Sequence, residues 1–222
     1  MTHASPPRIK FCGITALDDA KHAVEAGAWA LGVILFPGSP RRCDLTTAER
    51  IAATLRRQAE VCGVFVNAPL DEVTEIADGI GLTMVQLHGD EGPSYCAEVA
   101  RRTGAKVMKA ARVRTGADVA ALERFHTDLH LLDAHHPDRW GGTGETFDWE
   151  LLQRRRTDIP FVLSGGLTPD NVADAIAATH PYAVDTASGT EARPGVKDPE
   201  KLRAFAAAVA STAPAVPEPE PA

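Results

Sequence analysis

Short apolar runs alternate with amphipathic segments along almost the whole chain. Several of the runs are nearly continuous in Val, Ile, Leu and Phe, which is typical of parallel strands that are buried on both faces. The predicted strands are Ile9–Cys12, Ala30–Phe36, Val61–Val66, Met84–Leu87, Lys106–Ala110, Leu129–Asp133, Phe161–Ser164 and Ala183–Asp185. The predicted helices between and after them are Leu17–Ala26, Ala48–Gln58, Leu70–Ala77, Ser94–Arg102, Ala117–Phe125, Trp149–Arg155, Asn171–Thr179 and Pro199–Val209.

Start signals support three of these helices. Thr46 and Glu49 have the spacing of a capping box. Thr168 and Asp198 each precede a proline, which predicts an N-cap followed by Pro at the first helical position. Roughly eight strand–helix units in about 210 residues favour an α/β fold, a single (β/α)8 TIM barrel, over a doubly wound sheet, which has fewer strands per domain.

The chain length fits one domain of this kind. The sequence has 222 residues, of which 44% are hydrophobic, enough for a sizeable core. We expect residues 1–7 to form a disordered leader and residues 8–210 to form the barrel, which is the catalytic domain. Residues 211–222 are rich in Pro and Glu, and we expect them to be a disordered tail.

Charge and cysteine usage narrow the function classes. The formal net charge is −7, and no basic stripe suited to a nucleic acid is present. The four cysteines are scattered without a C-x-x-C pair, so zinc ribbons, redox motifs and a disulfide framework are not expected. The N-terminus lacks the pattern of a signal peptide, and the longest apolar stretch, residues 28–36, is too short to span a bilayer. We therefore expect a cytoplasmic protein that binds neither membranes nor nucleic acids.

Chemistry-bearing residues follow the predicted strands. In a barrel of this type the residues after each strand face the active site. Cys12 ends the first strand and Asp133 ends the sixth, which suggests an acid/base pair across a common pocket. The alternatives are that Cys12 is a small buried apolar residue and that Asp133 caps a helix. The strand-end positions are Cys12, Arg41–Arg42, Asn67, His88, Lys109, Asp133, 164–166 and Asp185 onward.

Two loops of small residues suggest a phosphate site. Gly165 and Gly166 follow the seventh strand and precede a predicted helix start, where the backbone can approach a ligand closely. Ser188 and Gly189 follow the eighth strand. Loops after strands seven and eight are where many barrels hold a phosphate, although a tight turn also explains a Gly-Gly pair.

Two further positions were weighed as ligand sites. Arg41 lies in a turn-rich loop after the second strand, where it is either a carboxylate clamp or a solvated arginine. His135 and His136 are adjacent, but no third ligand lies at a suitable spacing, so no metal site is expected.

Together these residues resemble the phosphoribosylanthranilate isomerase family of tryptophan biosynthesis. The resemblance runs from Lys10 to about Leu202. Its motifs are Lys10-Phe11-Cys12-Gly13-Ile14-Thr15, Ser39-Pro40-Arg41, Gly63-Val64-Phe65-Val66-Asn67, Val85-Gln86-Leu87-His88-Gly89, Leu131-Leu132-Asp133, Gly141-Gly142-Thr143-Gly144, Phe147-Asp148-Trp149, Leu163-Ser164-Gly165-Gly166-Leu167, Val184-Asp185, Ser188-Gly189 and Pro194-Gly195-Val196-Lys197-Asp198. All of them in this order at barrel spacing make the resemblance specific.

The resemblance implies an Amadori rearrangement of N-(5-phosphoribosyl)anthranilate to 1-(2-carboxyphenylamino)-1-deoxyribulose 5-phosphate. It implies that Asp133 is the general acid that opens the sugar ring and that Cys12 is the general base that removes the C2 proton. Arg41 would hold the anthranilate carboxylate, and Asp185 would line the pocket. No cofactor or metal is implied.

For the phosphate of this small phosphosugar substrate, the resemblance implies backbone donors at Gly165, Gly166, Ser188 and Gly189. Ala187 stands where the family more often has a serine, so one hydroxyl is missing near that site.

Further departures and alternatives remain. Glu145 stands where the family often has a lysine. A related phosphosugar isomerase or epimerase is one alternative, although bifunctional barrels of that kind place an aspartate where this chain has Cys12. A phosphate-binding barrel without catalysis is another, and it predicts the loss of one catalytic group. We expect the chain to be a monomer or a homodimer.

Overall fold

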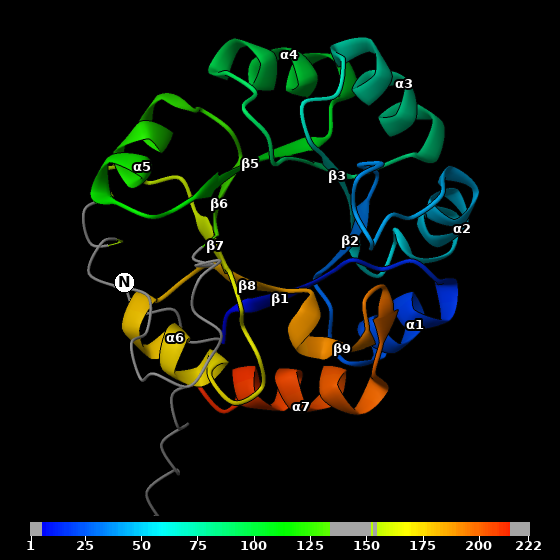
Figure 1. Ribbon diagram of the computed structural model, residues 1–222, viewed down its shortest axis with the longest axis vertical. Helices are drawn as coiled ribbons and strands as arrows, with labels where there is room; N and C mark the ends of the chain where they lie inside the picture. The colour runs from blue at the N-terminus through cyan, green and yellow to red at the C-terminus, as the bar shows by residue number, and fades with distance from the viewer. Residues whose placement is uncertain (1–5, 134–151, 153–154, 214–222) are drawn as a thin grey trace, which may run out of the picture.

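The computed structural model describes residues 6–133, 152 and 155–213. Its centre is a closed barrel of eight parallel strands in sequence order, around which the helices form an outer ring (Figure 1). The strands are β1 (Arg8–Cys12), β2 (Ala30–Ile34), β3 (Glu60–Phe65), β4 (Met84–Leu87), β5 (Lys106–Arg112), β6 (Leu129–Asp133), β7 (Phe161–Ser164) and β8 (Ala183–Thr186). The predicted (β/α)8 barrel and all eight predicted strands are confirmed.

Helices follow the strands on the outside of the barrel. None of those in the described ranges has the length and apolar character needed to cross a membrane. The residues His135, His136 and Glu145 lie outside the described residues, as does the predicted helix Trp149–Arg155 except for Leu152 and Arg155. The helices are α1 (Leu17–Glu25), α2 (Leu45–Leu55), α3 (Leu70–Ile80), α4 (Pro93–Thr103), α5 (Gly116–Ala121) with the 3₁₀ turn η1 (Leu122–Arg124), α6 (Val172–Thr179) and α7 (Pro199–Ala210).

Two of the predicted helix starts are wrong. Helix α2 is capped by Asp44, whose carboxylate accepts from Thr47 N at 2.9 Å, so the capping box at Thr46 does not form. Helix α6 begins at Val172, three residues beyond Pro169, with Asn171 at the N-cap position. At α7 the prediction is confirmed, since Asp198 accepts from the backbone of the first turn and Pro199 is the first helical residue.

The apolar side chains form two cores. One lies between the strands and the surrounding helices and contains residues such as Phe11, Leu31 and Phe205. The other contains only strand residues, among them Cys62, Met84 and Leu131, and therefore fills the barrel interior. In β3 to β8, strand residues on one face belong to the outer core and those on the other face to the interior core, which explains why these strands are apolar on both faces.

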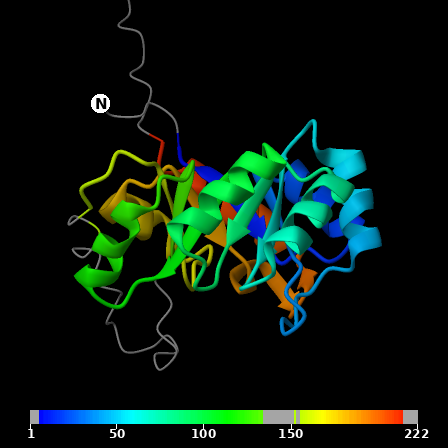
Figure 2. The ribbon, with the colours of Figure 1, turned by 90° about the horizontal axis from the view of Figure 1, so that it is seen from above.

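A short antiparallel hairpin follows β8. Its strands are β9 (Glu191–Arg193) and β10 (Val196–Lys197), preceded by the 3₁₀ turn η3 (Ser188–Thr190). Seen from the side, the hairpin lies at one end of the barrel beside the loop after β2 (Figure 2). This hairpin is not among the predicted elements, and it carries part of the candidate site.

Candidate active site

The predicted acid and base end two barrel strands. Cys12 is the last residue of β1 and Asp133 is the last residue of β6. Because all eight strands are parallel, both residues lie at the same end of the barrel. Cys12 is 6% exposed, so the thiol is largely shielded from bulk water.

A cavity of about 200 Å³ opens at this end of the barrel. Five of the predicted site residues line it, from the ends of β6, β7 and β8 and from the loops that follow. The complete lining is Asp133, Ser164, Gly165, Gly166, Leu167, Asp185, Thr186, Ala187 and Ser188. The folded chain therefore brings the predicted acid and most of the predicted phosphate loops to one cavity.

Asp185 joins the cavity to the barrel interior. Its Oδ1 accepts from Lys10 Nζ at 2.7 Å, and its Oδ2 accepts from Ser164 Oγ at 3.0 Å. Lys10 is wholly buried and Asp185 is 5% exposed. The two buried charges are thus paired with each other, as the burial of a charge requires.

The Cys12 thiol lies in a charged environment. Burial raises the pKa of the Cys12 thiol, and so does the nearby Asp185 carboxylate. The ammonium groups of Lys10 and Lys197 act in the opposite direction and lower the pKa of the thiol. The net direction is upward, so the thiolate forms less readily than in an exposed cysteine. A base at this position therefore depends on the nearby ammonium groups.

His88 lies beside the predicted acid. Its Nε2 is 3.5 Å from Asp133 Oδ2, and its Nδ1 is 2.8 Å from Gln86 Nε2. Gln86 thus contacts the His88 ring at Nδ1, and Nε2 lies on the side of Asp133. His88 was predicted to face the active site but was not assigned a role.

His88 lines a second and larger cavity, of about 510 Å³. The rest of its lining comes from the loops after β3 and β4, from the end of β5, and from α5 and η1. In its wall Lys109 Nζ donates to Glu91 Oε2 at 2.8 Å and to Gly89 O at 2.6 Å. This pair and the pair of Lys10 with Asp185 are two separate buried ion pairs.

The loops after β7 and β8 contact each other. Thr186 Oγ1 donates to Leu167 O at 2.8 Å. A Cβ atom on Gly189 would lie 2.0 Å from Leu167 O, so only glycine permits this approach. The two candidate phosphate loops therefore form one continuous surface.

Positive φ angles mark the first of these loops. Gly165 has a φ of 107° and Gly166 a φ of 67°, where a side chain is strained. The expected helix start directly after this loop is wrong, since α6 begins only at Val172. Asn171 instead closes the loop: its Nδ2 donates to Gly166 O at 3.1 Å.

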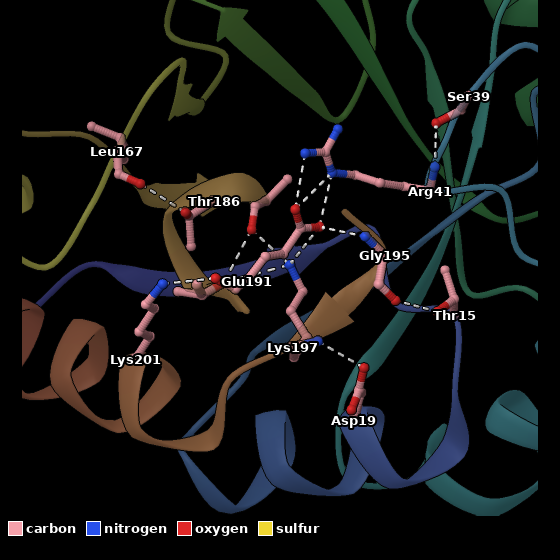
Figure 3. Close-up of polar contacts among 12 residues, drawn as sticks. Thr15, Asp19, Ser39, Arg41, Leu167, Thr186, Glu191, Gly195, Lys197 and Lys201 are labelled. Atoms are coloured by element: carbon pink, nitrogen blue, oxygen red, sulfur yellow. Dashed lines mark hydrogen bonds and ion pairs between the residues drawn. The ribbon is translucent and has the colours of Figure 1, made fainter. Parts of the chain in front are cut away.

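Arg41 binds a carboxylate of the protein itself. Its Nε lies 2.8 Å from Glu191 Oε1, and its Nη2 lies 2.9 Å from Glu191 Oε2, as Figure 3 shows. This is the two-pronged geometry by which a guanidinium recognises a carboxylate. Glu191 thus fills the position in which Arg41 was predicted to hold a substrate carboxylate.

Polar contacts fix the β9–β10 hairpin against the barrel (Figure 3). Lys197 Nζ donates to Ala187 O at 2.8 Å, and Lys197 N donates to Asp19 Oδ2 at 2.9 Å. Lys201 Nζ donates to Glu191 O at 2.8 Å. The contact to Ala187 reaches the backbone rather than a side chain, so the missing serine hydroxyl does not affect it.

Within the described part of the chain, no group of three or more His, Cys, Asp or Glu side chains is arranged to hold a metal ion.

Comparison with known proteins decides the family. A family model described as N-(5′phosphoribosyl)anthranilate (PRA) isomerase matches residues 9–208. The chain belongs to this isomerase family. Among curated relatives, the N-(5′-phosphoribosyl)anthranilate isomerase of Citrifermentans bemidjiense is 52% identical over 196 residues, which are 88% of this chain and 93% of that protein.

Solved structures of the isomerase family are similar throughout. The enzyme from Thermotoga maritima has a TM-score of 0.81 and 40% identity, covering 91% of this chain and 98% of the other. A structure in complex with reduced 1-(o-carboxyphenylamino)-1-deoxyribulose 5-phosphate has a TM-score of 0.78 and 38% identity over the same shares. A further Thermotoga maritima structure, of monomers generated from the dimeric enzyme, has a TM-score of 0.79, with 37% identity and the same shares covered.

Proposed function

We propose that this chain converts N-(5-phosphoribosyl)anthranilate to 1-(2-carboxyphenylamino)-1-deoxyribulose 5-phosphate, an Amadori rearrangement in tryptophan biosynthesis. The observation that carries the proposal is the family match over residues 9–208, which includes a thiol and a carboxylate at the same end of the barrel.

In the first step Asp133 acts as the general acid. It gives its proton to the furanose ring oxygen while the bond between that oxygen and C1 breaks. The nitrogen lone pair forms a C=N bond to C1, which leaves an open-chain iminium and the Asp133 carboxylate. After this step the Asp133 carboxylate faces His88, whose Nε2 lies 3.5 Å from Oδ2.

In the second step Cys12 acts as the general base. The cationic C=N bond acidifies the neighbouring C2–H, so a thiolate is a strong enough base to remove that proton. The C–H electrons form a C1–C2 double bond, and the C=N electrons return to nitrogen, giving an enolamine. The enolamine then loses the proton of its C2 hydroxyl and gains a proton at C1, which gives the ketone product. The Cys12 thiol releases the proton that it took and Asp133 takes one up, so both groups return to their starting states.

The phosphate anchor is proposed for Gly165, Gly166, Ser188 and Gly189. Support comes from the contact between the two loops at Leu167 O and from the cavity that they share with Asp133. A fixed phosphate holds the sugar so that its C2 proton faces the base, and such positioning contributes strongly to rate. Asp185 lines the same cavity.

A Gly166→Val variant is expected to lose most of its substrate affinity while Cys12 and Asp133 stay intact. The side chain would project where phosphate oxygens approach the backbone N–H groups. Because Gly166 has a φ of 67°, backbone strain also contributes. A Gly104→Val variant is the matched control, since Gly104 has a φ of 63° and open space around an added Cβ.

The measurement is kcat/KM together with circular dichroism of both variants, and competition by inorganic phosphate in the wild type. A folded Gly166→Val protein with an unchanged kcat/KM would remove this loop from the phosphate site. An equal loss in the Gly104→Val variant would assign the effect to strain.

Arg41 is proposed to hold the anthranilate carboxylate, which must then share or replace Glu191. An Arg41→Ala variant is expected to raise KM by about 10- to 100-fold, in line with about 1.5–3 kcal/mol for hydrogen bonds to charged groups. The kcat should change little, because the carboxylate contact persists through the reaction. Steady-state kinetics test this, with the exposed neighbour Arg42→Ala as the control. An unaltered KM would limit Arg41 to its structural contact with Glu191.

The reaction uses residues of the chain alone, and we propose that it needs no cofactor or metal. We also propose that the enzyme works in the cytoplasm as a monomer or a homodimer. A related phosphosugar isomerase or epimerase is the second candidate, and a phosphate-binding barrel without catalysis is the third.

Genetic complementation tests the proposed function. A bacterial strain that requires tryptophan because it lacks this isomerase should grow without tryptophan when it expresses this chain. Failure to grow, with folded protein present in the cell, would contradict the proposal and favour the second or third candidate.

A further inference from the structure

Lys10 is a charged residue inside the barrel. It lies two positions before Cys12 on β1, and alternate residues of a strand share one face. Cys12 pairs with Gly32 in register, and Gly32 pairs with Cys62, which belongs to the interior core. Lys10 and Cys12 therefore both point into the barrel.

Gly32 gives the two side chains room to approach each other. A Cβ atom on Gly32 would lie 2.7 Å from Cys12 Sγ and 3.1 Å from Lys10 Nζ. The thiol and the ammonium therefore both lie over the face of the same glycine. A larger residue at this position on β2 would push at least one of them away.

Asp185 holds the ammonium in place from the opposite side. Lys10 and Asp185 are register partners on the adjacent strands β1 and β8, and Nζ is 2.7 Å from Oδ1. An ammonium has three N–H donors, of which this contact uses one. A buried ion pair is weak evidence for stability, because apolar residues of similar volume serve a core equally well. Its place beside the thiol points to a role in the reaction.

We propose that Lys10 is a positioning residue whose ammonium stabilises the thiolate of Cys12, with Asp185 as the counter-ion that keeps Lys10 charged inside the barrel. The inference rests on the proposed function for the role of Cys12 as the base. The inference adds Lys10 as the group that enables the buried Cys12 thiol to act as a base.

The charges around Cys12 agree with this role. The Cys12 thiol interacts electrostatically with Lys10, Asp185 and Lys197. Lys10 interacts with Asp185, Cys12 and Cys62. Burial opposes the charge on Lys10, but Asp185, Cys12 and Cys62 together outweigh it, so the pKa of Lys10 lies above its ordinary value. Lys10 therefore stays charged over the range in which the thiol titrates. Of the groups that lower the pKa of Cys12, Lys10 acts most strongly.

The test is the rate of Cys12 alkylation by iodoacetamide as a function of pH, without substrate. Peptide mass spectrometry separates Cys12 from the other three cysteines. In Lys10→Met and Lys10→Gln variants the midpoint of this pH dependence should move up by about one pH unit or more. At a given pH below the midpoint, at least tenfold less of Cys12 is then thiolate.

Lys109→Met is the matched control. Lys109 is also a buried lysine on a barrel strand, paired with Glu91 at 2.8 Å, so its loss leaves a comparable unpaired carboxylate. In the Lys109→Met variant, the midpoint of Cys12 alkylation should equal that of the wild type. If the Lys109→Met variant shifts the midpoint as much as the Lys10 variants do, the shift reflects a general disturbance of the core, and the proposed role of Lys10 is wrong.

Unchanged midpoints in the folded Lys10 variants would overturn the proposal. If neither single variant folds, Lys10→Met combined with Asp185→Asn leaves no unpaired charge and is compared with Asp185→Asn alone. A higher midpoint in the double variant than in Asp185→Asn supports the role of Lys10, and equal midpoints in the two variants overturn it. The same upward shift should appear in the pH profile of kcat/KM, with little change in KM. Isomerase inactivity of the wild type, together with the alkylation shift, would reject only the proposed function.

Discussion

A Cys12→Ser variant is expected to lose about 10²–10⁴-fold in kcat, the range that a well-placed general base contributes. Serine is nearly the same size as cysteine, so the buried position at the end of β1 should tolerate it. A hydroxyl is far less acidic than a thiol, and the ammonium of Lys10 cannot convert it to an oxyanion near neutral pH. Steady-state kinetics and substrate binding, measured together, should show a lost kcat and a retained affinity.

The control for this variant is Cys96→Ser. Cys96 is also buried but lies on α4, away from the cavity. Its replacement should leave kcat unchanged. A wild-type kcat in Cys12→Ser would show that another group removes the C2 proton.

An Asp133→Asn variant is the second large expected loss, again by about 10²–10⁴-fold in kcat. Its amide has nearly the same shape as the carboxyl group but cannot give a proton to the ring oxygen. The expected fault is therefore in ring opening, before the step in which Cys12 acts. Asp128→Asn is a suitable control because Asp128 precedes the same strand at its other end, where its Oδ2 accepts from Val107 N at 2.8 Å. Near-normal kcat in Asp133→Asn would move the acid role to another residue.

The barrel was predictable because each parallel strand is buried on both faces and so reads as a continuous apolar run. The β9–β10 hairpin was not, because its strands have only three and two residues and include the exposed Arg193. Helix starts were predicted only in part, since Asp44 and Asn171 occupy the N-cap positions that the sequence pattern assigned to nearby Thr residues.

The candidate site divides along the same line. Strand-end residues such as Asp133 and loop glycines such as Gly166 were predictable from position alone, and they line one cavity. Glu191 was not, because its partner Arg41 is 150 residues away in sequence. Lys10 carried a usable signal, a single charge within an apolar run and two residues before the thiol. That signal gains meaning only when the register sets Lys10 opposite Asp185.

The most direct test of the central claim is the fluorescence of N-(5-phosphoribosyl)anthranilate, generated in situ, after addition of the purified protein. We predict a decay whose rate is proportional to the concentration of wild-type protein, and a decay at least 100-fold slower with Cys12→Ser or Asp133→Asn. No acceleration by the folded wild-type protein, or equal rates for wild type and both variants, would contradict the account.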